Sequence, residues 1–269
     1  MTEEYAPKHV CLFSGGHDSL VATHHCMENG ETEKVLHIDT GIGIPETQEF
    51  VRQVCEDQGW DLEIISSEAD YEEIVKEHGF PGGGAHGLMY IRLKDRALQA
   101  YSTRTDGKPH FYTGIRQDES DRRMRTTSDQ KVEEAKQYVW HSPILHWSEE
   151  DCREYMEEHD LPRSPVKQTY HHSGECLCGA FANRQEELLI LEAHYPETAK
   201  RIKNLEDEVR ECHGPQNDLS YWGHQDMDEP DLRGLKAEQD EQQATLDQKL
   251  CRDCSRNTPS PDQEGLQDE

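Results

Sequence analysis

The chain has 269 residues, enough for one large α/β domain with an appendage or for two small domains. It contains 56 acidic and 28 basic residues, a formal net charge of −28, and no apolar run approaches the roughly 18 residues of a membrane helix. The first residues lack the basic and apolar character of an export signal, so we expect a cytoplasmic protein with no membrane partner.

The acidic balance has two interpretations. In an ordinary cytosol it would repel nucleic acids and membranes. It is also the composition of proteins from salt-accumulating archaea, where a Debye length of about 3 Å at ~1 M salt removes the repulsion. We favour this halophilic interpretation, so charge does not exclude a nucleic-acid acceptor. The nine cysteines are an odd number without an export signal, which favours metal or redox chemistry over a complete disulfide framework.

A glycine loop between a strand and a helix is the first functional motif. The apolar run 10–13 leads into Ser14-Gly15-Gly16-His17-Asp18-Ser19, and residues 20–29 follow with helical spacing. Backbone N–H groups in such a loop and the positive end of the helix bind anions. The hydroxyls of Ser14 and Ser19 are further donors, and Asp18 can hold a divalent cation. The alternative is an ordinary flexible turn.

Strands and helices then alternate. Residues 34–39 form the second predicted strand, and Asp39 lies at its carboxyl end, where ligands collect in an open α/β sheet. Pro45 and Glu46 suit the first turn of the next helix. A third strand over 62–65 and a helix over 71–78 complete the pattern. We therefore predict an α/β fold with a doubly wound, mostly parallel, Rossmann-like sheet.

Two later stretches are candidate ligand contacts. The glycine-rich residues 79–87 precede a predicted helix over 88–101, and they are either a second phosphate or substrate contact or a plain connector. A strand end at His110 to Thr113 runs into a loop with four arginines, whose guanidinium groups suit phosphate or sulfate. The alternative there is a solvated charged face. Further on, Ser148 is a good N-cap for a helix that runs to about His159.

Four motifs in this order resemble the phosphoadenosine phosphosulfate (PAPS) reductase family of the PP-loop ATP pyrophosphatase superfamily. They are the loop Ser14 to Ser19, Ile-Asp-Thr-Gly at 38–41 with Pro-Glu-Thr at 45–47, Thr-Gly-Ile-Arg-x-Asp-Glu-Ser at 113–120, and Pro-Ile-Leu-x-Trp-x-Glu-Glu-Asp at 143–151. The resemblance covers roughly residues 8 to 165 and implies an adenine nucleotide alpha hydrolase-like fold. It also implies that the adenine nucleotide contacts are Ser14, Gly15, Gly16, His17, Asp18, Ser19, Asp39, Gly114 and Arg116, with Arg122 or Arg123 facing a phosphate or sulfate.

This chain departs from the reductases in two ways. The family's reductases usually have a degenerate first loop and a catalytic cysteine in a C-terminal Glu-Cys-Gly-x-His motif. Here the loop is intact, and the nearest match is Glu-Cys-His-Gly at 211–214. We therefore expect an ATP- and Mg²⁺-dependent adenylyltransferase in sulfur metabolism, with Asp18 and Arg116 catalytic and with sulfate, tRNA or DNA as acceptor.

Two alternatives remain. One is a PAPS or adenylyl-sulfate reductase that uses Cys212 as nucleophile and a thioredoxin-like reductant; the other is a non-catalytic nucleotide-binding regulatory subunit. A sulfur donor as partner and assembly as a homo-oligomer are left open.

Two short-spaced cysteine pairs follow the family motifs. Cys176 and Cys178 in one loop, with Cys251 and Cys254 near the carboxyl end, supply four thiolates for a [4Fe–4S] cluster or for Zn²⁺. ATP-using relatives often carry a cluster, which favours iron, and the alternative is two unconnected pairs. Cys212, His213, His171 and His172 are possible replacement ligands.

Helical spacing predicts two packing helices between these pairs, over 186–194 and 199–209. We assign residues 1–165 to a nucleotide-binding α/β domain, 166–254 to a helical cysteine-containing extension and 255–269 to a disordered tail.

Overall fold

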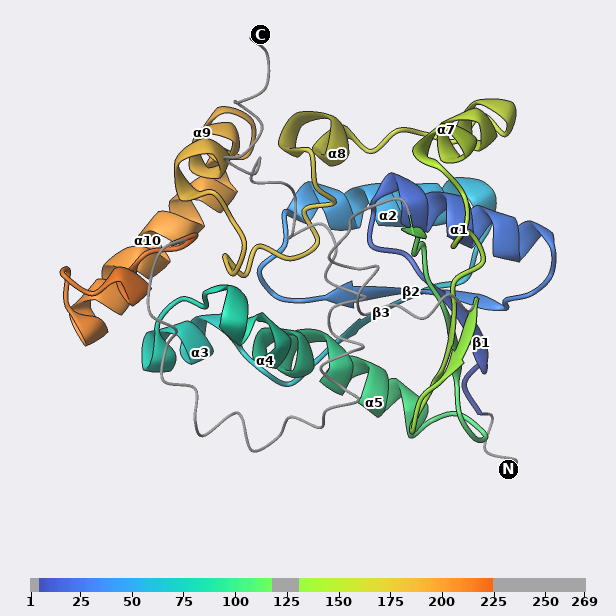
Figure 1. The fold of residues 1–269 in the computed structure, drawn as a ribbon, viewed down its shortest axis with the longest axis horizontal. Helices are drawn as coiled ribbons and strands as arrows, with labels where there is room; N and C mark the ends of the chain where they lie inside the picture. The colour runs from blue at the N-terminus through green and yellow to red at the C-terminus, as the bar shows by residue number, and fades with distance from the viewer. Residues whose placement is uncertain (1–4, 118–130, 225–269) are drawn as a thin grey trace, which may run out of the picture.

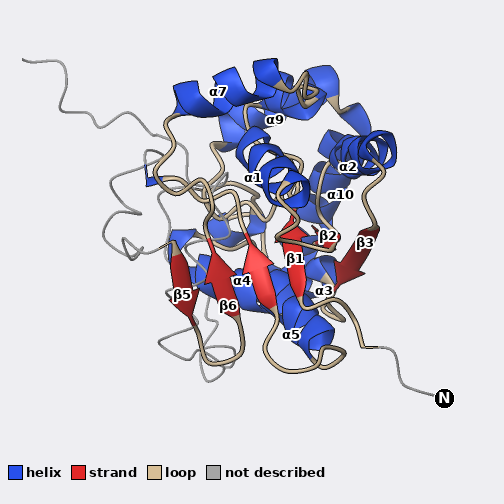
Figure 2. Cartoon of the chain, turned by 90° about the vertical axis from the view of Figure 1, so that its right-hand side faces the viewer, coloured by secondary structure: helices blue, strands red, loops and turns tan. Residues whose placement is uncertain are grey.

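A mixed sheet with mostly parallel strands forms the centre of the molecule (Figures 1 and 2). The structure is a computed structural model and describes residues 5–117 and 131–224. Within them the sheet has the order β3-β2-β1-β4-β6-β5. Its strands are β1 (His9–Leu12), β2 (Lys34–Asp39), β3 (Leu62–Ser66), β4 (His110–Tyr112), β5 (Val132–Glu134) and β6 (Val139–His141). The described pairs are parallel except β5 with β6, which confirms the predicted mostly parallel sheet.

Helices cover both faces of the sheet. One face carries α1 (His17–Glu28), α2 (Pro45–Gln58) and α7 (Glu149–Glu158). Their apolar side chains pack with Phe13 and Val35 in one buried cluster. The opposite face carries α4 (His86–Tyr90) and α5 (Arg96–Ser102), and α5 packs against Leu12 and Leu36. Burial on both faces explains why strands β1 and β2 are nearly continuous apolar runs, and it confirms the doubly wound fold.

The order of the strands creates a crevice at one edge of the sheet. From β1 the chain adds β2 and β3 on one side, and β4 pairs with β1 on the other side. The loops that follow β1 and β4 therefore leave the same ends of neighbouring parallel strands. Such a switch point is where open α/β sheets bind ligands.

The helix predicted over 88–101 is interrupted. Instead of one regular helix, the chain forms α4, a π-helical turn over Ile91–Asp95 and α5. The π turn buries Lys94 and Asp95. The preceding glycine stretch also contains a 3₁₀ turn, Gly83–Ala85.

The carboxyl-terminal part of the described chain packs against the α/β part. It contains α8 (Pro165–Tyr170), α9 (Arg184–His194), α10 (Pro196–His213) and a 3₁₀ turn, Asp218–Ser220, and α10 packs on α3 (Tyr71–His78). The two predicted packing helices are confirmed by α9 and α10. One buried cluster joins Ile44 and Val75 to Val166, Leu191 and Trp222, so the core continues across position 165.

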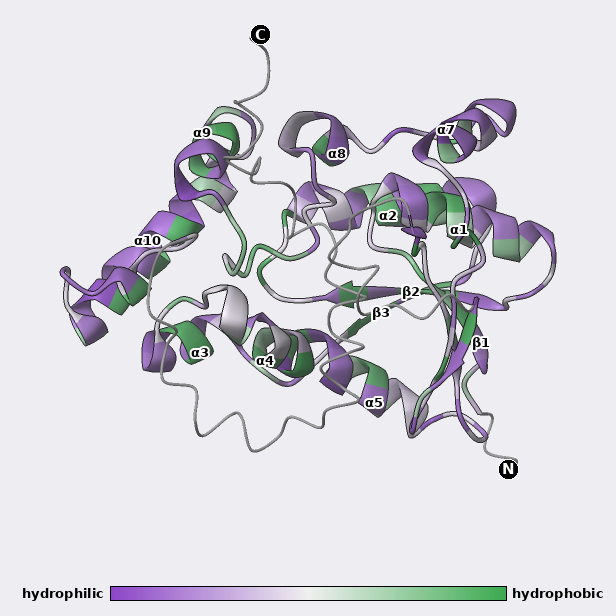
Figure 3. Cartoon of the chain, viewed as in Figure 1, coloured by the Kyte–Doolittle hydropathy of each residue, from purple (hydrophilic) through white to green (hydrophobic). Residues whose placement is uncertain are grey.

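Hydropathy follows this packing. In Figure 3 the outer turns of α7 and α10 are hydrophilic and the apolar colour lies toward the inside. Among the described helices, none is both long and apolar enough to cross a membrane.

Candidate functional site: a cavity at the switch point

The loop after β1 is closed by its two serines. Ser14 Oγ and Ser19 Oγ lie 3.0 Å apart, and Ser19 Oγ donates to the carbonyl of Gly16 at 2.9 Å. Gly16 is the N-cap of α1 and supplies no capping side chain. No side chain caps the start of α1, and a helix N-terminus without a side-chain cap is a general binding site for anions.

Gly15 and Thr47 fix this loop against α2. Gly15 has φ +84°, a left-handed conformation that favours glycine, and a Cβ there would lie 2.7 Å from Thr47 Cγ2. Thr47 is the last residue of the Pro-Glu-Thr motif at 45–47, and its Oγ1 donates to the carbonyl of Ser173 at 2.6 Å. One threonine thus connects the loop after β1 to a segment more than a hundred residues later.

Gly114 brings the loop after β4 against the start of α1. A Cβ at Gly114 would lie 2.5 Å from the carbonyl carbon and oxygen of Asp18 and from the nitrogen of Ser19. Because these are backbone atoms, only glycine permits the contact. Two residues later the Arg116 guanidinium contacts the Asp18 carboxylate twice, Nε to Oδ1 at 3.0 Å and Nη2 to Oδ2 at 3.2 Å. The two predicted catalytic residues are therefore partners, and the Arg116 side chain is 7 % exposed.

A second wall of the site comes from residues 173–178. Ile44 N donates to Gly174 O at 2.7 Å, and Leu177 N donates to Ile42 O at 3.1 Å. Thr40 Oγ1 donates to Glu175 O at 2.8 Å. The motif after β2 thus holds the Cys-x-Cys loop in place by its backbone.

A buried ion pair reinforces this wall. Lys94 Nζ lies 3.0 Å from Glu175 Oε2, and the two side chains are 5 % and 8 % exposed. Lys94 comes from the π turn, so the pair joins the helix before β4 to the residue directly before Cys176. On the outer side Tyr71 donates its hydroxyl to Cys178 O at 2.9 Å, and burial raises the pKa of that hydroxyl well above its usual value.

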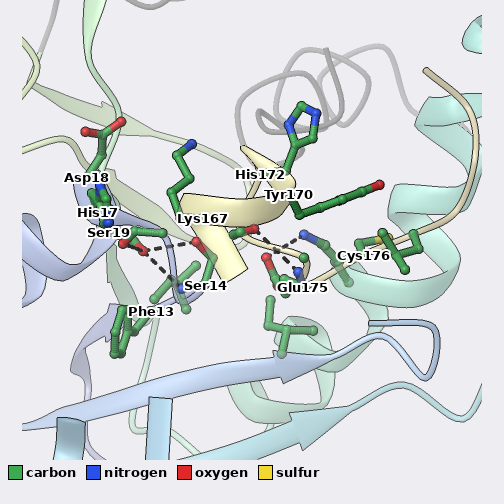
Figure 4. A pocket seen from close by; sticks show the side chains of 18 of the residues that line it. Phe13, Ser14, His17, Asp18, Ser19, Lys167, Tyr170, His172, Glu175 and Cys176 are labelled. Atoms are coloured by element: carbon green, nitrogen blue, oxygen red, sulfur yellow. Dashed lines mark hydrogen bonds and ion pairs between the residues drawn. The ribbon is translucent and has the colours of Figure 1, made fainter. Parts of the chain in front are cut away.

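These walls enclose one cavity (Figure 4). It is lined by the loop after β1, by the carboxyl ends of β1 and β2, by residues 113–115, and by residues of α8 and the segment that follows it. The space between its lining side chains, open solvent at the mouth included, is about 1080 Å³. Ser14, His17, Asp18, Ser19 and Cys176 all line it. The loop after β1 and a cysteine thus face the same space.

Other predicted site residues lie elsewhere. Asp39 ends β2, its carboxylate accepts the N–H of Gly41 at 2.8 Å, and it does not line the cavity. Cys178 is buried in the core, and Cys212 is exposed near the end of α10, outside the cavity lining. Arg122, Arg123, Cys251 and Cys254 lie outside the described residues. In the described part of the chain, no group of three or more histidine, cysteine or acidic side chains is placed to hold a metal ion.

Several cavity residues escaped the sequence analysis. They are Lys167, Tyr170, Glu175 and Glu187, and His172 was considered only as a replacement metal ligand. Lys94 lies in the helix predicted after the glycine-rich candidate contact, and the structure places it in the cavity wall. The Ser-Pro pair at 164–165 was an available signal, because proline at the first helical position after a serine cap predicts a short helix there.

Comparison with known proteins places the chain in a family. The family model "Phosphoadenosine phosphosulfate reductase domain" matches residues 8–178. The phosphoadenosine 5'-phosphosulfate reductase of Xylella fastidiosa strain M12 is 29% identical over 172 residues, which cover 61% of this chain and 69% of that protein. The enzyme of the same name from Xanthomonas euvesicatoria is 28% identical over 171 residues, with 61% and 68% covered.

Solved structures with related folds are more distant. The PAPS reductase of Candida auris is 21% identical with a TM-score of 0.44, and the match covers 61% of this chain and 78% of that one. The U34-tRNA thiolase of Methanococcus maripaludis, solved with its [4Fe–4S] cluster, is 16% identical with a TM-score of 0.41, covering 77% and 73%. The family model spans more than half of the chain, including both loops that meet at the switch point, and the chain therefore belongs to the phosphoadenosine phosphosulfate reductase family.

Proposed function

We propose that this protein is an ATP-using enzyme of the family, which transfers an adenylyl group to an acceptor in sulfur metabolism and releases pyrophosphate. The observation that carries the proposal is the intact loop Ser14 to Ser19, held by Gly114 at the switch point and opening into a cavity that also contains Cys176. A loop with two hydroxyl donors, an uncapped helix start and an acidic residue suits a triphosphate with its metal ion.

The proposed reaction is an adenylyl transfer. An acceptor oxygen attacks the α-phosphorus of ATP, a new phosphorus–oxygen bond forms, and the bond to the β-phosphate oxygen breaks as pyrophosphate leaves with the electron pair. In this scheme the chain contributes positioning and charge stabilisation. Backbone N–H groups of the loop and the hydroxyls of Ser14 and Ser19 bind phosphate oxygens, and Leu36 and Ile38 at the end of β2 form an apolar wall for the adenine ring.

The donor set near the loop suits Mg²⁺. The Asp18 carboxylate is 24% exposed, and each of its oxygens has a second lone pair beyond its contact with Arg116. A hard cation takes such oxygen ligands and keeps several waters. Bound Mg²⁺ would neutralise negative charge on the phosphates. The role of Arg116 in this proposal is to orient Asp18 rather than to bind the phosphates directly.

The cysteine pair suits a thiophilic metal only in part. The proposal takes four thiolates, from Cys176 and Cys178 and from Cys251 and Cys254, but of the described pair only Cys176 lines the cavity, and Cys178 is buried in the core. Thiolates favour an iron–sulfur cluster or Zn²⁺. An iron–sulfur cluster there would bind or activate sulfur, or would hold the extension in place. Its proposed position, beside the phosphate loop in one cavity, favours the first role.

A second candidate is sulfonucleotide reduction. The names of the Xylella and Xanthomonas relatives favour it, and Cys212 would then be the nucleophile, with a thioredoxin-like protein as reductant. In the structure Cys212 is exposed on α10 and outside the cavity, so this candidate needs the cysteine to approach the nucleotide from elsewhere. A regulatory subunit that binds ATP without turnover is a third candidate.

One experiment separates the three candidates. The protein is purified anaerobically in molar KCl, its iron and zinc are measured, and pyrophosphate release from ATP is assayed with sulfate, RNA or DNA. Release that depends on one acceptor supports the proposal, and Cys176→Ser should lower the metal content while Cys212→Ser leaves both readouts unchanged. Oxidation of reduced thioredoxin by PAPS, abolished by Cys212→Ser, would make the reductase candidate correct. Tight ATP binding with no release for any acceptor would favour the regulatory candidate.

A further inference from the structure

The end of the cavity away from the loop after β1 is apolar. In Figure 4 Ser14 and Ser19 lie at one end of the lining, and Tyr170 and Cys176 lie at the other. Beyond Cys176 the lining continues into six residues that we call the apolar end: Leu177, Gly179, Ala180, Phe181, Ala182 and Trp222. We infer that the apolar end binds a flat, uncharged aromatic ring, which belongs to the acceptor of the adenylyl group. The identification of the ring with the acceptor rests on the proposed function.

Small and aromatic residues shape the apolar end. Gly179 has φ +86°, and a Cβ there would lie 2.7 Å from Trp222 Cδ1, so the indole packs directly on the backbone. Trp222 Nε1 donates to Leu177 O at 2.7 Å, which leaves the indole to contribute apolar surface. Glycine and alanine side chains let a ligand approach the backbone closely, and aromatic side chains stack on flat rings. This combination suits a ring better than a bulky aliphatic group.

The glycine-rich residues 79–87 support the apolar end from behind. A Cβ at Gly83 would lie 2.9 Å from Phe181 Cε1, so the phenyl ring packs directly on this stretch. Phe80 N donates to Leu219 O at 2.7 Å, three residues before the indole. The sequence offered this stretch either as a ligand contact or as a plain connector. Its contacts give it a third role, because it holds both aromatic residues of the apolar end in place.

The polarity of this end favours an uncharged ligand. Its six side chains carry no charge, so an inorganic anion would leave water without a compensating cation. The carbonyl of Cys178 already accepts the hydroxyl of Tyr71 at 2.9 Å. Glu187 lines the cavity beside Tyr170 and accepts its hydroxyl, and burial raises the pKa of this carboxyl. A carboxyl that keeps its proton donates as well as accepts, which suits the N–H and C=O groups at the edge of a ring.

The ring has two sources with the same chemistry. It belongs either to a free aromatic compound or to an unpaired base of single-stranded RNA. Apolar and aromatic surfaces bind both, because every base has a π face. The two sources differ in whether the strand that carries the ring adds affinity, so one binding experiment distinguishes them.

The test measures dissociation constants by ligand-observed NMR titration of the full chain in molar KCl, with AMP at saturation. The aromatic probes are uracil and benzamide, each compared with its saturated counterpart, dihydrouracil or cyclohexanecarboxamide, and hexauridylate represents RNA. The variants are Phe181→Leu, which removes the ring, and Ala180→Leu, which fills the space. Phe50→Leu, at a half-buried position of α2 outside the cavity lining, is the matched control. Thermal unfolding shows whether each variant is folded.

We expect each aromatic probe to bind about fivefold or more tightly than its saturated counterpart. Phe181→Leu and Ala180→Leu should each remove most of this preference, and Phe50→Leu should keep it. Hexauridylate that binds about tenfold or more tightly than uracil assigns the ring to an RNA base, and equal affinity assigns it to a free compound.

Three results would overturn the inference. They are no aromatic preference in the wild type, displacement of the aromatic probes by AMP, and a preference that both cavity variants retain as fully as Phe50→Leu does. Binding is measured without turnover, so an absence of pyrophosphate release would reject the proposed function and leave this test intact.

Discussion

The contact between Gly114 and the start of α1 gives the sharpest test of how the site is assembled. In Gly114→Ala the added Cβ would lie 2.5 Å from three backbone atoms of Asp18 and Ser19. Ordinary carbon contacts are about 3.5–4.0 Å, so the loop after β4 must move by roughly 1 Å away from the phosphate loop. The φ of Gly114 is not in the left-handed region, so the substitution adds bulk without backbone strain.

The expected loss of stability follows from this displacement. Overpacking of a close contact typically costs about 1–3 kcal/mol. For a chain of this size that lowers the melting temperature by roughly 2–4 °C for each kcal/mol. ATP affinity should fall by more than the stability change alone explains, because the same movement displaces the Asp18 and Ser19 N–H groups that bind phosphate in our proposal.

A matched glycine provides the control. At Gly82 a Cβ would meet only His224 Cε1 at 3.5 Å, an ordinary contact, and its φ of −90° is available to alanine. Both variants are compared with the wild type by thermal unfolding and by calorimetric titration with ATP. If Gly114→Ala matches Gly82→Ala in melting temperature and in ATP affinity, the two loops do not assemble the site as described.

Two further predictions concern buried charge. Lys94→Met removes the cation that pairs with Glu175 in the cavity wall, so we expect the free energy of unfolding, measured with denaturant, to fall by about 3–5 kcal/mol. The double variant Lys94→Met/Glu175→Met should recover part of this loss. A Lys94→Met variant as stable as the wild type would contradict the prediction. The pKa of His141 is lowered to about 4, mainly by burial and further by the charges of His110 and His9. Between pH 6.5 and 4 the unfolded chain therefore binds more protons than the folded chain. Stability should therefore be complete above pH 6.5 and fall by about 1–2 kcal/mol toward pH 4, after a discount for partial exposure. His141→Phe should flatten this slope in pH-dependent unfolding, and an unchanged slope would show that His141 is not its source.

The sequence by itself was sufficient for most of the elements and for the two loops that meet at the switch point. Strand β1 was predictable from the apolar run Val10 to Phe13, and helices α3, α9 and α10 from their amphipathic spacing. Both signals are local patterns that can be read directly from neighbouring residues. The glycines at 15, 16 and 114 and the order of the four motifs pointed to the loops that meet at the switch point. Strands β5 and β6, of three residues each, were missed, and β4, of the same length, was predicted only as a strand end.

Only the tertiary structure decided what these residues contact. The pairing of Arg116 with Asp18 spans 98 residues of sequence, and that of Lys94 with Glu175 spans 81. The placement of Cys176 in the same cavity as Ser14 depends on backbone hydrogen bonds between the motif after β2 and residues 173–177. Local patterns carry no information about such contacts, because the chain between the partners can fold back in many ways and the shared core selects one of them.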